Sequence, residues 1–311
     1  MKIAIIGTGA MGSVYAARFV EAGLDVVAID PWEAHIDAIN SKGLRLNGPD
    51  GDRVVQGLVA TTDPKQAQGA DLIIIATKAS GVAAAAQSVC PFVGPETTVL
   101  TIQNGLGAGE RICEFLPEAN VLLGVADGFG ASMQGPGHVT HTAMKLIRLG
   151  EVTGGLTPRL SQIEALWQRA GFTAKAFDDI HQLIWEKLLC NVTLSAPCTV
   201  FDCSVGVLLE TPERWSVALD CMQEAYACAK ASEIDFSFED PVAYVTAFAK
   251  AVGNASPSMR LDHLARRSSE IDFINGAVPP IGRHLNVPTP VNDRLVAEVR
   301  KREAKFTKET L

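Results

Sequence analysis

The chain has 311 residues, of which 47% are hydrophobic and 20% charged, and its formal net charge is -8. This length fits two globular domains, and the composition excludes a disordered chain. The negative charge, with no basic cluster among aromatic residues, excludes nucleic acid as an expected partner. There is no basic leader and no apolar run of bilayer length, and seven scattered cysteines predict reduced thiols; we therefore expect a cytoplasmic protein without a membrane segment.

The opening of the chain predicts a dinucleotide-binding strand, turn and helix. A β-branched run, Lys2 to Ile6, leads into G-x-G-x-x-G, and helical spacing then continues as far as Gly23. The first glycine of this motif permits a tight turn, the second lets a pyrophosphate approach the backbone, and the third lets helix and strand pack closely. The alternative is an ordinary strand-to-helix turn. The expected cofactor loop consists of Gly7, Thr8, Gly9, Ala10, Met11 and Gly12.

A second apolar run supports the cofactor site. Asp30 directly follows the run Val26 to Ile29. Its distance in sequence from the glycine motif is about that at which such folds place a carboxylate on the adenosine ribose. A helix is expected from Pro31 to Ser41, with Gly43 as its cap. Two antiparallel strands, 44–46 and 54–58, should flank a turn at 48–51.

Two further strands should end at the same crevice. Asp71 to Thr77 is a continuous apolar run, typical of a strand buried on both faces of a parallel sheet, and Lys78 follows it. Val99 to Ile102 is another such run, and Asn104 follows in a glycine-rich loop. Open α/β sheets bind ligands at these strand ends, so Thr77, Lys78 and Asn104 are candidate ligand contacts. The alternatives are a solvated lysine and a turn asparagine.

Short strands from Val121 to Gly150, with a turn at 135–137, are expected to close the sheet, and 145–149 is expected as an edge strand. A helix over 160–171 and a last strand or connector over 172–177 follow. Beyond this point helical periodicity dominates. We therefore expect an α/β, doubly wound Rossmann domain over residues 1–177 and an all-helical domain over residues 178–311.

The helical domain contains two polar sets. An amphipathic helix is expected from Asp178 to Cys198, and its residues Lys187, Asn191 and Ser195 lie at i, i+4 and i+8 on one stripe. Such a stripe is either a solvated face or the wall of a polar pocket. In the second set, Ser258 begins a helix and Glu270 follows twelve residues later. For Glu270 the alternative is a surface ion pair with the arginines at 266 and 267. Cys190, Cys198 and Cys203 lack metal-ligand spacing, so no metal site is expected.

Five motifs in this order resemble those of the ketopantoate reductase (2-dehydropantoate 2-reductase) family. They are G-T-G-A-M-G at residue 7, T-K-A at residue 77, Q-N-G at residue 103, W-E-K-L-x-x-N at residue 185 and E-I-D-F-I-N-G at residue 270. The resemblance covers nearly the whole chain. It implies a Rossmann domain, a helical domain and an active site in the cleft between them.

The resemblance also implies roles for individual residues. It implies that Lys187 is the general acid. It also implies that Glu270 either accepts a hydrogen bond from a substrate hydroxyl or assists Lys187. It places Lys78 near the nicotinamide. The residues implied to position the 2-oxo acid are Asn104, Asn191 and Ser258. Ser195, which lies on the same stripe as Asn191, is a further candidate substrate contact.

The chain departs from the family pattern at both ends of the site. Ser195 replaces the second asparagine of the helix, and a further asparagine is replaced near Val205. Family members commonly use NADPH, with a basic residue after the second strand, whereas here Asp30 is followed by Pro31-Trp32-Glu33. These differences favour NAD(H) over NADP(H) and a changed substrate pocket.

The sequence therefore predicts NAD(P)H-dependent reduction of a small-molecule 2-oxo acid to the (R)-2-hydroxy acid, as in conversion of 2-dehydropantoate to pantoate. The first alternative is an NAD-dependent D-2-hydroxy acid dehydrogenase acting on bulkier, mandelate-like acids. The second is a dinucleotide sensor that has lost the chemistry. A homodimer is compatible with the sequence, which does not define the oligomeric state.

Overall fold

A computed structural model describes residues 1–306, which divide into two compact units. The N-terminal unit comprises Met1–Gln103 and Ala108–Ile180. The C-terminal unit comprises Asn104–Gly107 and the chain from His181 onward. The short segment 104–107 thus belongs to the C-terminal unit, although the chain on both sides of it belongs to the other unit.

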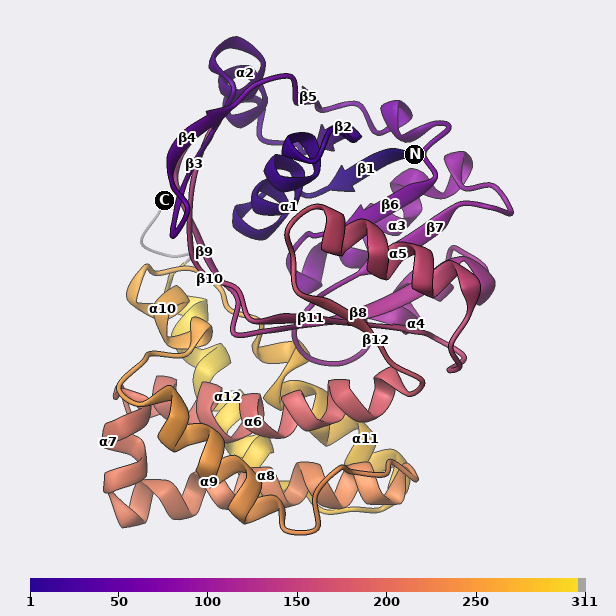
Figure 1. The fold of residues 1–311 in the computed structure, drawn as a ribbon. Coiled ribbons are helices and arrows are strands. Elements are labelled where there is room, and N and C mark those ends of the chain that lie inside the picture. Colours follow the sequence, from indigo (N-terminus) through magenta and orange to yellow (C-terminus); the bar gives the residue numbers. More distant parts are fainter. Residues whose placement is uncertain (307–311) are drawn as a thin grey trace. The chain divides into compact units, whose positions relative to one another are not determined.

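The N-terminal unit is built on an eight-stranded sheet with the order β12-β11-β8-β7-β6-β1-β2-β5 (Figure 1). The six strands from β8 to β5 are parallel, and β11 runs antiparallel to β8. The strand order reverses at β1, which lies between β2 and β6, so the ligand site of a doubly wound sheet is expected at the carboxyl ends of these strands. The strands are β1 (Lys2–Ile6), β2 (Asp25–Ile29), β5 (Val59–Thr61), β6 (Leu72–Ile75), β7 (Thr98–Thr101), β8 (Val121–Asp127), β11 (Leu146–Glu151) and β12 (Ala174–Ala176).

Helices connect these strands and cover the sheet. Every residue of β6 is buried, as expected for an interior parallel strand covered on both faces. Tyr15 and Phe19 pack edge-to-face against Trp167, with ring centroids 4.9 and 5.0 Å apart, so they share one core. The helices and 3-10 turns are α1 (Ala10–Glu21), α2 (Glu33–Lys42), η1 (Pro64–Ala67), η2 (Ala79–Gly81), α3 (Val82–Val89), η3 (Cys90–Phe92), α4 (Ala108–Cys113), η4 (Glu118–Asn120) and α5 (Pro158–Arg169).

A second, four-stranded sheet with the order β4-β3-β10-β9 stands beside α1 (Figure 1). Its strands are β3 (Leu44–Gly48), β4 (Gly51–Val55), β9 (Gly130–Gly135) and β10 (His138–Ala143). The hairpin of β3 and β4 is confirmed, but its second strand begins earlier than the expected residue 54. The turn is shorter than expected because Gly51, at φ +100°, pairs directly with Gly48.

Two expectations about the region 121–150 are wrong. Strands β9 and β10 do not close the main sheet, because β10 pairs with β3 and β9 pairs with β10 in the second sheet. Strand β11 is not at an edge, because β12 pairs with it on the far side. Strand β12 lies within residues 172–177, where a last strand or connector was expected, but the pattern did not show that this strand would pair with β11 and form the edge.

The C-terminal unit is all-helical in the part of the chain that the structure describes. Its elements are α6 (Ile180–Val200), α7 (Val205–Glu210), α8 (Pro212–Ala231), α9 (Pro241–Val252), α10 (Ser258–Leu264), η5 (Ile271–Phe273), η6 (Asn275–Ala277), α11 (Val278–Leu285) and α12 (Pro290–Phe306). Within residues 1–306 no helix has the length and apolar character needed to cross a membrane.

Helix α6 is the central element of this unit rather than an amphipathic surface helix. From Leu188 to Thr199 every residue except Asn191 is buried, and the core includes Leu189, Val192 and Ala196. Helices α8 and α12 contribute to the same core. The expected amphipathic pattern is therefore wrong, because neighbouring helices surround α6. Its cysteines, Cys190 and Cys198, are buried and form no disulfide with the described part of the chain.

Candidate active site

The glycine loop has a geometry that only glycine allows at two positions. Gly7 has φ +90°, and a Cβ there would lie 2.7 Å from the main-chain nitrogen of Thr77. A Cβ on Gly12 would lie 2.0 Å from the carbonyl oxygen of Gly7. The first contact brings the end of β6 against the end of β1, and the second brings the start of α1 against the turn. Gly7, Gly12 and Thr77 are therefore packed together at the switch point of the sheet.

The loop is open where a phosphate would approach. A Cβ placed on Gly9 would meet nothing within 4 Å, and Gly9 is the N-cap residue of the twelve-residue helix α1. The hydroxyl oxygens of Thr8 and Thr77 are buried without a hydrogen-bond partner among residues 1–306. An open backbone at a helix N-terminus, with unsatisfied polar groups beside it, fits a dinucleotide pyrophosphate.

Asp30 is fixed next to this loop. One carboxylate oxygen accepts a hydrogen bond from the main-chain N–H of Thr8 at 2.8 Å, and the other accepts from that of Trp32 at 2.9 Å. Each oxygen retains a second lone-pair direction for a ligand hydroxyl. The negative charge is thus held beside the loop at the end of β2. Trp32 stacks on His35, with ring centroids 5.2 Å apart and planes 11° from parallel.

The ends of β6 and β7 are joined by a side chain that the sequence did not single out for a role. The side-chain amide of Gln103 donates to the main-chain carbonyls of Ile75 at 2.8 Å and Thr77 at 3.0 Å. Lys78 follows as the exposed N-cap of η2. In the sequence, Gln103 stood out as the first residue of the Q-N-G motif and by its place directly after a buried strand, but neither signal assigned it a role.

In the C-terminal unit, α6 presents two kinds of polar side chain. The hydroxyls of Thr193 and Thr199 donate to carbonyls one turn earlier, Leu189 at 2.6 Å and Ser195 at 2.7 Å, so they serve the helix itself. By contrast, the amide of Asn191 and the hydroxyl of Ser195 make no side-chain hydrogen bond with the described part of the chain. Asn191 is half-buried and Ser195 is 4% exposed.

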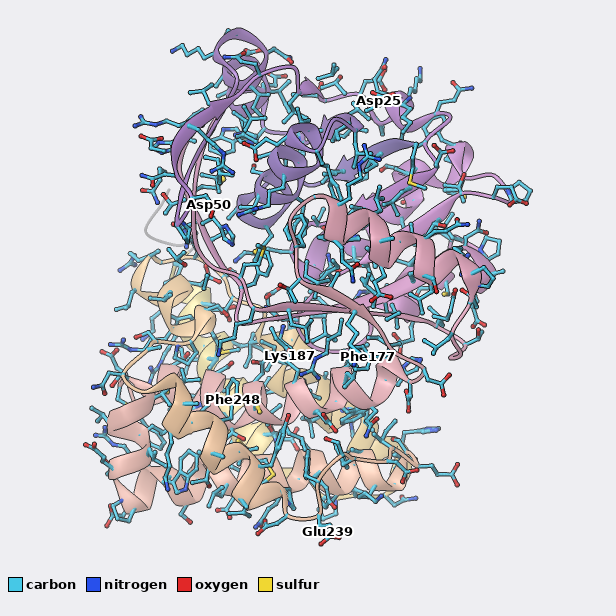
Figure 2. The ribbon with its side chains drawn as sticks, viewed as in Figure 1. Asp25, Asp50, Phe177, Lys187, Glu239 and Phe248 are labelled. Atoms are coloured by element: carbon cyan, nitrogen blue, oxygen red, sulfur yellow. The ribbon has the colours of Figure 1, made fainter. Side chains whose placement is uncertain are left out.

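Lys187 lies one turn before Asn191 on α6 and is half-buried (Figure 2). The helix therefore places an ammonium, an amide and a hydroxyl in sequence along one line. Because Ser195 is buried, the inner end of this line is small and shielded from water.

The Asn104 loop is attached to the segment that carries Glu270. The main-chain N–H of Leu106 donates to the carbonyl of Phe273 at 2.9 Å. A Cβ on Gly105 would lie 2.0 Å from that same oxygen, so only glycine fits there. The Asn104 loop and the E-I-D-F-I-N-G motif therefore meet in one unit, although Asn104 and Glu270 are 166 positions apart in the chain (270 − 104).

Asn275, the asparagine of the second motif, joins this segment to α6. Its side-chain amide donates to the carbonyl of Val192 at 3.0 Å and to the side-chain oxygen of Asn292 at 3.1 Å. Asn292 in turn donates to the carbonyl of Cys221 and to the carboxylate of Glu224, both at 2.8 Å. Sequence analysis missed Asn275, Asn292 and Glu224 as a group, because their separation in the chain hides that they meet.

The remaining two candidates differ in their surroundings. Glu270 is half-buried and is the N-cap residue of η5. Arg267, one of the arginines considered as its surface partner, pairs instead with Asp262 at 3.1 Å. Ser258 is exposed at the first position of α10.

The candidates thus fall into two sets, one in each unit. The N-terminal set comprises the glycine loop, Asp30, Thr77 and Lys78, and it has the form of a dinucleotide site. The C-terminal set offers an ammonium, a carboxylate, amides and hydroxyls, which are groups that can hold and protonate a small oxo acid. No cluster of three or more potential metal-ligating side chains occurs among residues 1–306.

Comparison with known proteins agrees with this division. Residues 3–154 match the family model of ketopantoate reductase PanE/ApbA, and residues 179–303 match the model of its C-terminal domain. The chain belongs to the ketopantoate reductase family, and it is an oxidoreductase of the 2-dehydropantoate 2-reductase type.

Individual relatives extend over the full chain. A 2-dehydropantoate 2-reductase of Streptococcus pyogenes is 30% identical over 305 residues, with 98% of each chain covered. A ketopantoate reductase structure from Ralstonia eutropha has a TM-score of 0.90 at 29% identity, covering 99% of this chain and 100% of that one. A D-mandelate dehydrogenase in complex with NADH and anilino(oxo)acetate has a TM-score of 0.89 at 28% identity, covering 99% and 100%. At the level of the family, the activity is reduction of a 2-oxo acid with a nicotinamide cofactor.

Proposed function

We propose that this protein reduces a 2-oxo acid to the (R)-2-hydroxy acid, in the manner of 2-dehydropantoate 2-reductase, and that it favours NADH over NADPH. The observation that carries the proposal is the assembly, in the C-terminal unit, of the Asn104 loop, the Glu270 segment and helix α6 with Lys187. The glycine loop of the N-terminal unit supplies the matching cofactor site.

The residues of the N-terminal unit would hold the cofactor through its phosphates and ribose. The main-chain N–H groups of Gly9 and Ala10 at the start of α1 would bind the pyrophosphate. Asp30 would accept hydrogen bonds from the adenosine ribose, and Thr77 and Lys78 would lie along the remainder of the cofactor. When bound, the nicotinamide supplies the hydride that reduces the 2-carbonyl carbon of the substrate.

The residues of the C-terminal unit would manage the charge that then develops on the carbonyl oxygen. The Lys187 ammonium would stabilise this oxygen and donate a proton from Nζ. Asn104, Asn191 and Ser258 would orient the carboxylate and carbonyl groups of the acid. Glu270 would accept a hydrogen bond from a substrate hydroxyl or from Lys187.

Ser195 supports a second candidate, an NAD-dependent D-2-hydroxy acid dehydrogenase acting on bulkier acids. A serine at this buried position is shorter than the asparagine of the family pattern and leaves more room beyond Asn191. The similarity to a D-mandelate dehydrogenase points the same way. The two candidates share their chemistry and differ only in the substituent on the oxo acid.

The test is a screen of purified enzyme against 2-oxo acids, following oxidation of NADH and of NADPH separately. The panel should contain 2-dehydropantoate, phenylglyoxylate and branched aliphatic 2-oxo acids, with chiral chromatography of each product. We expect the (R)-2-hydroxy acid from at least one of them, with NADH the better cofactor. If wild-type enzyme binds NADH but reduces none of these acids, the proposed function is wrong.

A further inference from the structure

His35 lies outside every motif that led to the proposed function, yet it is completely buried next to the cofactor loop. It comes from α2, whereas the loop precedes α1 and the turn at Gly137 joins β9 to β10. Three segments that are distant in the sequence therefore meet at one imidazole ring.

The hydrogen bonds around the ring define its tautomer. The main-chain N–H of Gly137 donates to Nδ1 of His35 at 2.9 Å, so this nitrogen is an acceptor and the ring proton must be on Nε2. Nε2 then donates to the hydroxyl of Ser13, in a long contact of 3.4 Å. The Ser13 hydroxyl in turn donates a hydrogen bond to the carbonyl oxygen of Thr8 at 2.7 Å.

The neutral ring suits this arrangement. Burial lowers the pKa of His35, while the negative charge of Asp30 acts in the opposite direction. The charged or titratable residues nearest in sequence to the ring and its partners are Glu33 and Asp37 on α2 and His138 after Gly137. Because Nδ1 already accepts a hydrogen bond from Gly137, a second ring proton placed on Nδ1 would find no acceptor there.

The carbonyl of Thr8 matters because it belongs to the peptide that presents the next N–H to the ligand. In a trans peptide the C=O and the following N–H point in opposite directions. Because the Thr8 oxygen is hydrogen-bonded to Ser13, the N–H of Gly9 points away from Ser13. A Cβ on Gly9 would meet no atom within 4 Å, so there is open space beside Gly9. The other side of Thr8 is also fixed, since its own N–H donates to Asp30.

We propose that His35 and Ser13 are positioning residues for the cofactor, which hold the Thr8–Gly9 peptide so that the N–H of Gly9 faces the pyrophosphate. If this peptide turned over, a carbonyl oxygen would face the phosphate in place of a donor. The inference rests on the proposed dinucleotide binding and adds residues from α1, α2 and the β9–β10 turn to the cofactor site.

The test measures binding of NADH, ADP and adenosine to four variants. Ser13→Ala and His35→Leu remove the chain of hydrogen bonds. His35→Gln keeps a donor toward Ser13, since the side-chain nitrogen of glutamine can replace Nε2. Ser41→Ala is the matched control, because that hydroxyl donates only to carbonyls of its own helix, α2.

Loss of one hydrogen bond to a charged phosphate should weaken NADH and ADP binding about ten-fold to a hundred-fold in Ser13→Ala and His35→Leu. Adenosine, which lacks phosphate, should bind as it does to wild type, and kcat at saturating NADH should stay within a few-fold. His35→Gln should recover most of the NADH affinity, and the effects of Ser13→Ala and His35→Leu should not add in the double variant.

Several results would overturn the inference. One is unchanged NADH affinity in Ser13→Ala, and another is equal weakening of adenosine and ADP, which would indicate a general structural role. Failure of the proposed function is a separate outcome, since it would appear as absence of NADH binding or of 2-oxo acid reduction in the wild-type enzyme.

Discussion

The side-chain amide of Asn275 donates to the main-chain carbonyl of Val192 at 3.0 Å, which ties the segment after Glu270 to the helix that carries Lys187. Both asparagines of the connecting network, Asn275 and Asn292, are completely buried. Val192 directly follows Asn191, so the bond sets the register of the two polar segments proposed to bind the substrate.

This bond predicts a stability effect for Asn275→Ala. The change removes the donor to Val192 and to Asn292, and each buried group left without a partner costs about 1–3 kcal/mol. We expect a lower free energy of unfolding, measured by urea denaturation with circular dichroism. Asn254→Ala, at an exposed position, is the control and should change little. Equal unfolding midpoints for the two variants would show that the network does not stabilise the unit.

The glycine loop predicts that two alanine substitutions separate binding from stability. In Gly12→Ala the new Cβ would lie 2.0 Å from a main-chain oxygen, so both folding stability and NADH binding should fall. In Gly9→Ala the new Cβ meets nothing within 4 Å and φ is −61°, so stability should be almost unchanged. NADH affinity should nevertheless fall, because the methyl group occupies the proposed pyrophosphate position. Calorimetry of both variants tests this, and normal NADH binding by Gly9→Ala would contradict the placement of the phosphate.

Asp30 predicts the preference for NADH. Its carboxylate is held by Thr8 and Trp32, and the extra phosphate of NADPH would face it as a like charge. Two unit charges about 4 Å apart repel by about 1 kcal/mol in water and about 4 kcal/mol at an effective dielectric near 20, which corresponds to roughly five-fold to a thousand-fold discrimination. Asp30→Asn should reduce the ratio of kcat/KM for NADH over NADPH toward one.

The control for that experiment is Asp25→Asn, at the opposite end of β2 (Figure 2). The two positions are five residue steps apart, which is about 16 Å along a strand and exceeds the Debye length of about 8–10 Å at moderate ionic strength. Asp25→Asn removes the same charge and should leave the cofactor ratio unchanged. If both variants shift the ratio equally, the preference arises from net charge rather than from Asp30.

Ser195 predicts the breadth of substrate use. Because its side chain is small, wild-type enzyme should accept oxo acids with a larger or less polar substituent than that of 2-dehydropantoate. Ser195→Asn should shift kcat/KM toward hydroxylated substrates, provided that its thermal midpoint shows a folded protein at this buried site. A wild-type enzyme that prefers 2-dehydropantoate to phenylglyoxylate and branched acids by orders of magnitude would refute the broader pocket.

The sequence predicted the parts of this fold that depend on local pattern. The buried run at Leu72–Ile75 and the glycines at 7 and 12 have local causes, a two-faced parallel strand and a tight turn, and both stand in the structure. Contacts between distant segments were not predictable in this way. The pairing of β12 with β11, the pairing of β3 with β10, and the hydrogen bonds of Asn275 to Val192 and of Gly137 to His35 all depend on tertiary packing.

The proton donor is the most specific element of the proposed mechanism. Lys187→Met keeps the length of the side chain and removes its charge, whereas Lys187→Arg keeps the charge on a group that does not release its proton. Lys78→Met is the matched change in the N-terminal unit, and it should mainly weaken ligand binding. Each variant needs a thermal midpoint and an NADH binding constant near wild type before its rate is interpreted.

The measurement that tests the account most directly is kcat for 2-oxo acid reduction by folded Lys187→Met with saturating NADH. General acid catalysis contributes about a hundred-fold to ten-thousand-fold in rate, so we expect kcat of Lys187→Met to fall by about a hundred-fold or more. Lys187→Arg should recover part of this loss. A kcat within a few-fold of wild type would remove Lys187 from the acid role and leave Lys78 as the candidate donor.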